Sequence, residues 1–91
     1  MENKPTYEEL CAELNELAHE LDPWYNVSKV KWYMVCVCTK DETEDNVFDI
    51  LSDGVNWYDE THVVPSEVYP IIGKIQAQMK EIDKWFEEAV R

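Results

Sequence analysis

The chain has 91 residues, which is enough for one domain built around one hydrophobic core. Apolar residues make up 45% of it, which argues against intrinsic disorder, and no apolar run approaches the length of a membrane-spanning helix. Twenty acidic residues against eight basic ones give a net charge of −12. We therefore expect no direct binding to nucleic acid or to a membrane surface, because both are anionic.

A first helix is predicted over residues 7–21. Thr6 and Glu9 have the spacing of a capping box, and an apolar stripe follows at helical spacing. The stripe consists of Leu10, Leu14, Leu17 and Leu21. The pair Asp22-Pro23 then ends the helix, because a proline disfavours helical geometry in the residue before it.

Three strands are predicted, over residues 29–39, 47–51 and 55–58. The first is an unbroken β-branched and aromatic run. Its alternation places one set of side chains on one face, namely Val30, Trp32, Met34, Cys36 and Cys38, and a second set on the other, namely Tyr33, Val35 and Val37. Because both faces are apolar, we expect a central, covered strand. Asp53-Gly54 predicts a tight hairpin between the other two strands, with the glycine supplying positive φ.

A second helix is predicted over residues 67–89, with Pro70 in its first turn and a long isoleucine-rich stripe after it. The element order is α-β-β-β-α. The sequence therefore predicts a single small acidic α+β domain over residues 1–91. We expect a three-stranded antiparallel sheet with both helices packed on one face, which gives the two apolar stripes a common place to bury.

Acidic residues repeat along the first helix at i, i+4, i+7 and i+11, offset by one position from the leucines. The row consists of Glu9, Glu13, Glu16 and Glu20. Successive carboxylates then lie roughly 5–6 Å apart along one edge of the helix, on the scale of charges along a nucleic-acid strand. Like charges at this spacing destabilise an isolated helix, so a functional interpretation is favoured over a purely solubilising one.

Further acids and aromatic residues extend the predicted partner-binding surface. A polar turn contributes Asp41, Glu42, Glu44 and Asp45, and a third acidic group consists of Asp49, Asp53, Asp59 and Glu60. Trp24 follows the first helix, and Trp57 and Tyr58 follow the hairpin turn. Aromatic rings left outside a core often anchor contacts between proteins, so we expect the acids and these rings to bind a basic protein surface.

Residue patterns typical of a metal site or an enzyme active site are weak or absent in the sequence. The pair Cys36-x-Cys38, with Cys11, His19 and His62 elsewhere, fits zinc ligation poorly, and buried thiols are the simpler interpretation. No phosphate-binding loop or nucleophile motif is present, so we expect no enzyme activity, no cofactor and no metal. The odd number of cysteines and the polar N-terminal residues favour a cytoplasmic protein.

In size, charge and helix–sheet–helix order the chain resembles small acidic inhibitors encoded by phages and other mobile elements. These include DNA-mimicking anti-restriction proteins, anti-CRISPR proteins and inhibitors of uracil glycosylase. The resemblance implies a protein-binding inhibitor of a nucleic-acid enzyme, and it carries over no individual residue. The alternative is a structural or assembly protein that forms a homo-oligomer, such as a homodimer, through its amphipathic helices, with the negative charge serving solubility.

Overall fold

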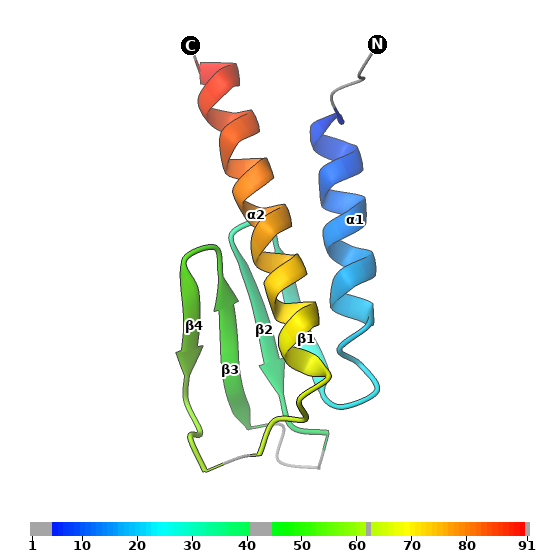
Figure 1. Ribbon diagram of the computed structural model, residues 1–91, viewed down its shortest axis with the longest axis vertical. Helices are drawn as coiled ribbons and strands as arrows, with labels where there is room; N and C mark the ends of the chain where they lie inside the picture. Colours follow the sequence, from blue (N-terminus) through cyan, green and yellow to red (C-terminus); the bar gives the residue numbers. More distant parts are fainter. Residues whose placement is uncertain (1–4, 41–44, 62, 91) are drawn as a thin grey trace.

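The computed structural model describes residues 5–40, 45–61 and 63–90 (Figure 1). The elements of this part of the chain are α1 (Tyr7–His19), β1 (Asn26–Lys31), β2 (Met34–Cys38), β3 (Asn46–Leu51), β4 (Gly54–Trp57) and α2 (Val68–Val90). The α+β class is confirmed. The predicted three-stranded sheet is wrong, because the antiparallel sheet has four strands in the order β1-β2-β3-β4.

The extra strand arises because residues 29–39 form a hairpin instead of one strand. Lys31 pairs with Met34, so Trp32 and Tyr33 alone make the turn. Two-residue hairpin turns usually contain Gly, Asn or Asp, and this turn contains none of them. The Trp32 ring instead lies 4.7 Å from that of Phe86 on α2, so the turn is attached to the helix by aromatic packing.

The hairpin also changes which residues share a face. Val30 pairs directly with Val35, so it lies on the same face as Val35 and Val37, and the prediction that placed it with Cys36 is wrong. β1 is an edge strand, so of the two strands that replace the predicted one only β2 is central. The face of β2 that carries Val35 and Val37 is buried, whereas Met34 and Cys36 on the other face remain half-exposed.

The second hairpin turns one residue earlier than predicted. Leu51 pairs with Gly54, so Ser52 and Asp53 form the turn and Gly54 is the first residue of β4. The φ angle of Gly54 lies outside the left-handed region, so the expected positive φ is not found there. Because the register of β3 against β4 depends on this turn, the shift decides which side chains meet across the two strands.

Both helices begin close to their predicted positions. The side chain of Thr6 caps α1 by accepting a hydrogen bond of 3.2 Å from the Glu9 amide. The regular helix ends at His19, two residues early, and the chain continues as tight turns ahead of Pro23. Pro70 lies in the first turn of α2, where its missing N–H breaks no helical hydrogen bond.

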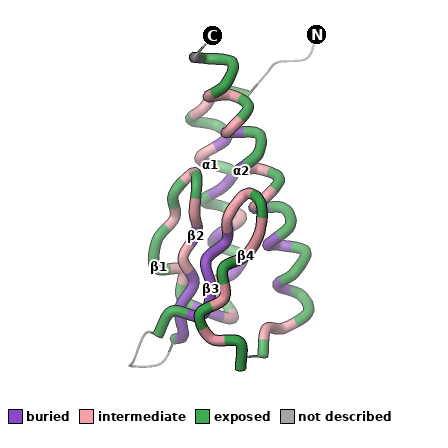
Figure 2. Tube along the Cα trace, turned by 90° about the vertical axis from the view of Figure 1, so that its left-hand side faces the viewer, coloured by how far each residue is buried: buried purple, intermediate pink, exposed green. Residues whose placement is uncertain are grey.

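The two helices cover one face of the sheet and leave the other face uncovered (Figure 2). Their apolar stripes and the inner face of the sheet form one core. The fully buried large side chains at its centre are Leu14, Leu21, Val35, Val37, Val47, Phe48, Ile50, Val68, Ile75, Met79 and Ile82. None of the helices in the described part of the chain is long and apolar enough to cross a bilayer.

An aromatic cluster covers the parts of the helices that extend past the sheet (Figure 1). Tyr7 of α1 lies 5.0 Å from Trp85 and 5.1 Å from Phe86 of α2, measured between ring centroids. Trp32 joins them from the β1–β2 turn and also contacts Tyr33 at 5.2 Å. Aromatic packing therefore joins α1 to α2 in this region, where no strand covers the helices.

Candidate functional site

The glutamate row, defined as Glu9, Glu13, Glu16 and Glu20, is exposed along its whole length. Glu20 is the C-cap residue of α1, so the row extends from the first turn of the helix to its end, about 16 Å by helical rise. No ion pair joins any of the four carboxylates to another described residue. The row is therefore a run of like charges that the described part of the fold leaves uncompensated.

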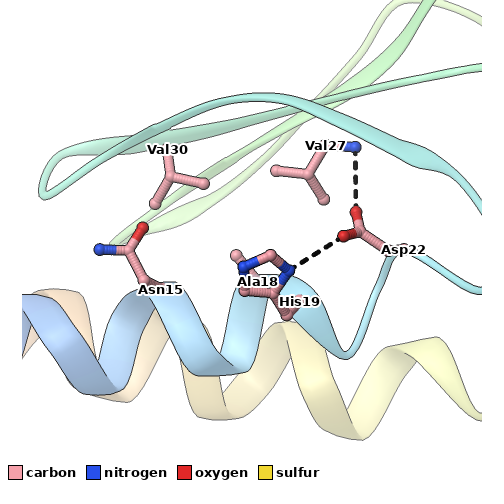
Figure 3. A pocket seen from close by; sticks show the side chains of 6 residues that line it. All are labelled: Asn15, Ala18, His19, Asp22, Val27 and Val30. Carbon is pink, nitrogen blue, oxygen red and sulfur yellow. Dashed lines mark hydrogen bonds and ion pairs between the residues drawn. The ribbon is translucent and has the colours of Figure 1, made fainter.

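The glutamate row faces away from the sheet. On α1, the residues that face β1 are Asn15, Ala18 and His19, which line a hollow together with Val27 and Val30 (Figure 3). At 100° per residue the glutamate row lies roughly 140° around the helix from these residues and roughly 100° from the leucines on its other side. The leucines are directed into the core, and the glutamate row is left in solvent beside them.

The other predicted acids do not join the glutamate row on one surface. Asp41, Glu42 and Glu44 lie outside the described residues. Asp45 is exposed just before β3, and the acids of the third group lie in β3, in the β3–β4 turn and in the loop after β4. In Figure 1, α1 and β4 lie at opposite sides of the molecule. The structure therefore separates the acidic groups, and the glutamate row is the longest continuous one that it describes.

The predicted aromatic anchors are placed differently from one another. Trp24 is half-buried against the core beyond the end of α1, and the neighbouring Tyr25 is fully buried. Trp57 packs its ring on Phe48 at 5.0 Å and is also half-buried. Tyr58 is 55% exposed and points to the opposite face of β4. Of the three, Tyr58 is the ring most available for contact, and it lies far from the glutamate row.

The uncovered sheet face carries a polar cluster that the sequence analysis did not identify. The strand register aligns Lys29, Cys36, Asp49 and Asn56 across the four strands. Asp49 is only 6% exposed, and its Oδ2 accepts a 2.6 Å hydrogen bond from the Tyr58 hydroxyl. That hydroxyl in turn accepts a hydrogen bond from the Asn56 side chain at 3.3 Å. The predicted turn at Asp53-Gly54 would place Tyr58 directly opposite Asp49. The observed register instead pairs Asp49 with Asn56, and Tyr58 reaches Asp49 from two residues further along the chain.

Two groups beside Asp49 have raised pKa values. The hydrogen bond to Asp49 raises the pKa of Tyr58 above the usual 10.0, and the negative charge of Asp49 adds to the effect. The pKa of the Cys36 thiol is raised above 9.0, mainly by burial and further by the hydrogen bond to Asp49. At neutral pH the cluster is thus one carboxylate surrounded by protonated donors, which suits a structural role better than a reactive thiol.

The hollow between α1 and β1 contains a histidine–carboxylate pair (Figure 3). His19 Nδ1 lies 3.1 Å from Asp22 Oδ2, and Asp22 Oδ1 accepts a 3.4 Å hydrogen bond from the Val27 amide. The hollow measures about 80 Å³, and the six residues that line it include no serine, threonine or cysteine. The pair therefore connects the end of α1 to β1 and has no nucleophile beside it.

The three cysteines are free thiols. Cys36 and Cys38 were predicted to share one face, but the register of β2 against β3 shifts between Val37 and Cys38, so the regular alternation of β2 ends before Cys38. Cys38 is buried, whereas Cys11 and Cys36 are half-exposed. Within residues 5–40, 45–61 and 63–90, no group of three His, Cys, Asp or Glu side chains is arranged to hold a metal ion. His62, which the sequence analysis weighed as a ligand, lies outside these residues.

Comparison with known proteins adds no relative. No protein-family model matches the chain, and neither the curated proteins nor the solved structures contain a match to it.

Proposed function

We propose that the chain is a small acidic protein-binding module that inhibits a nucleic-acid-binding enzyme. The glutamate row of α1 takes the place of the anionic backbone of a nucleic acid in a basic groove of that enzyme. The observation that carries the proposal is the row itself, four exposed carboxylates on one helix face with no ion-pair partner among the described residues.

Electrostatics favour a role for the row outside the fold. Like charges at i, i+4 cost an isolated helix about 0.2–0.5 kcal/mol per pair, so the row does not stabilise α1. A basic groove on a partner would remove this repulsion and attract the module over a Debye length. The row has one charge per roughly 5.5 Å of helix axis, a lower density than the one per about 3.4 Å along a DNA strand, so it would engage some of the cations in a phosphate-binding groove and not all of them.

The resemblance to phage-encoded inhibitors suggests where to look for the partner. Restriction enzymes, CRISPR effectors and DNA glycosylases all bind nucleic acid through basic grooves, and all are blocked by small acidic proteins of this general character. An anti-restriction or anti-CRISPR role is therefore the form of the proposal that we would test first, with the module acting in the cytoplasm.

A capture experiment from lysate tests the proposal. The wild-type chain, Glu13→Lys/Glu16→Lys and Glu67→Lys/Glu87→Lys are each immobilised, and bound proteins are eluted in steps of rising salt and then with a short DNA duplex. Glu67 and Glu87 are exposed and lie before and near the end of α2, so the third protein has the same net charge as the second with an intact glutamate row.

We expect the wild type and the Glu67/Glu87 variant to retain a nucleic-acid-binding protein that salt or the DNA duplex releases. The Glu13/Glu16 variant should not retain it. Equal loss in both variants would show that only total charge matters, and equal capture by all three would remove the glutamate row from the proposal.

The alternative, a homo-oligomer formed through the amphipathic helices, has less support. The leucine and isoleucine stripes that would form such an interface are buried within the chain, between the helices and the sheet. A homodimer would have to use other surfaces. Sedimentation at rising protein concentration distinguishes the two, since the inhibitor proposal needs no self-association.

A further inference from the structure

A second hollow lies on the opposite side of the molecule from α1, where β4, the loop after it and the first turn of α2 meet. It measures about 350 Å³ and is lined by Trp57, Glu60, Val64 and Tyr69. This is within the size range of small-molecule sites, roughly 300–1,000 Å³. Two of the four lining residues are aromatic and one is a carboxylate, and this combination suits a particular class of ligand.

The two rings are held in different ways. Trp57 rests on Phe48 of the core with 5.0 Å between ring centroids, so one side of the indole is fixed. Tyr69 is 54% exposed and makes no ring contact with another described residue. Both rings therefore line the hollow, and they do not stack on each other.

The electrostatic surroundings of the hollow are negative. Glu60 is exposed and has no ion-pair partner among the described residues. Residues 57–69, which supply the described lining of the hollow, contain Asp59, Glu60 and Glu67 and no lysine or arginine. An anionic ligand would be repelled by this segment, whereas a cation would be attracted to it.

The N-terminus of α2 adjoins the hollow, and a helix N-terminus normally repels cations. Here its free amides are few. The amides of Val68 and Tyr69 donate to the carbonyls of Pro65 and Ser66, at 3.0 and 3.3 Å, and Pro70 has no N–H. The adjacent Glu67 is exposed and acidic. The positive end of the helix is thus largely satisfied within the chain.

We infer that this hollow binds an organic cation, an alkylammonium or guanidinium group seated between Trp57 and Tyr69 with Glu60 beside it. Cations are attracted to the faces of aromatic rings, and Trp and Tyr are the strongest of these acceptors. The group has two sources, a free small cation or a lysine or arginine side chain of a protein. The inference is independent of the glutamate row, which lies on a different element.

The test is a titration followed by NMR, with the Trp57 indole N–H and the Val64 and Tyr69 amides as reporters. The probes are tetramethylammonium, N-acetyl-arginine amide and N-acetyl-lysine amide, at constant ionic strength. The neutral controls are tert-butanol and N-acetyl-glutamine amide. The variants are Tyr69→Ala, Tyr69→Phe and Glu60→Gln, all at exposed positions, since replacing Trp57 would also disturb the core.

We expect saturable shifts at all three reporters with at least one cation and none with the neutral controls. Tyr69→Ala should weaken binding about fivefold and Glu60→Gln about threefold, whereas Tyr69→Phe should bind within about twofold of wild type. Preference for tetramethylammonium identifies a free cation as the ligand, and preference for the amino-acid amides identifies a protein side chain. Equal binding of the neutral controls, affinity unchanged in Tyr69→Ala, or no saturation with any cation would overturn the inference.

Discussion

The glutamate row of α1 and Asp49 of β3 show two opposite uses of the same functional group. Asp49 is 6% exposed and accepts a hydrogen bond of 2.6 Å from Tyr58, so its charge is enclosed by donors of the chain itself. The four glutamates are exposed and have no ion-pair partner among the described residues. The carboxylate of Asp49 contributes to the fold, whereas the four glutamate carboxylates make no ion pair with the described residues and are accessible to a partner.

Selection for stability alone would retain Asp49 and would not retain the glutamate row. Removing the buried carboxylate of Asp49 leaves its hydrogen-bond donors without an acceptor, which lowers the free energy of unfolding. Removing one of several exposed like charges relieves repulsion. Substitutions at Asp49 should therefore change the stability of the protein, and substitutions in the glutamate row should change its binding to a partner. The experiments below test whether the two effects are separate.

The largest effect on stability is expected for Asp49→Ala. The substitution removes the acceptor of the Tyr58 hydroxyl, and we expect a loss of about 2 kcal/mol in the free energy of unfolding. For a chain of this size that corresponds to a fall of roughly 8–16 °C in Tm. Urea unfolding followed by circular dichroism measures it, with Asp53→Ala in the exposed β3–β4 turn as the matched control.

A smaller loss of stability than that of Asp49→Ala is expected for Tyr58→Phe at neutral pH, because the ring remains and only the hydroxyl is lost. A double-mutant cycle with Asp49→Ala isolates the energy of the pair. If the two single effects simply add, the hydrogen bond between Tyr58 and Asp49 contributes nothing to stability.

The same pair predicts a dependence on alkaline pH. Hydrogen bonding to Asp49 raises the pKa of Tyr58 above 10.0 in the folded state. The stabilisation is therefore complete below the unfolded value and is lost as pH rises through the folded one. Unfolding free energies measured from about pH 8 upward should fall more steeply for wild type than for Tyr58→Phe. Parallel curves would contradict this assignment.

The exposed acids and the buried acid also differ in how far the sequence alone could predict their surroundings. The glutamate row was predictable because helical spacing is a local property, read from one segment. The polar row across the uncovered sheet face was not, because it depends on the register of four strands, one of which was not predicted. The expected Asp53-Gly54 turn would place Asp49 opposite Tyr58, whereas the observed turn pairs Asp49 with Asn56 and Tyr58 reaches it from two residues further along. The hairpin at Trp32–Tyr33 was not predicted because its turn contains no Gly, Asn or Asp, and Trp32 packs on Phe86 instead.

The smallest effect is expected in the glutamate row. Glu13→Gln/Glu16→Gln should raise the free energy of unfolding by a few tenths of a kcal/mol at low salt, because repulsion along α1 decreases. The gain should shrink as salt is added, since the charges are exposed and easily screened. Thermal unfolding at two salt concentrations checks it, and a clear loss of stability would mean that these carboxylates support the fold after all.

The most direct measurement compares the affinity of wild type and Glu9→Gln/Glu13→Gln/Glu16→Gln/Glu20→Gln for the captured partner at low and high salt. We predict that the wild type binds tightly at about 0.1 M salt and loses affinity as screening increases. The variant should bind weakly at both, with an unfolding free energy no lower than that of wild type. Equal affinity of the two proteins at low salt would contradict the proposal that the glutamate row is the binding surface.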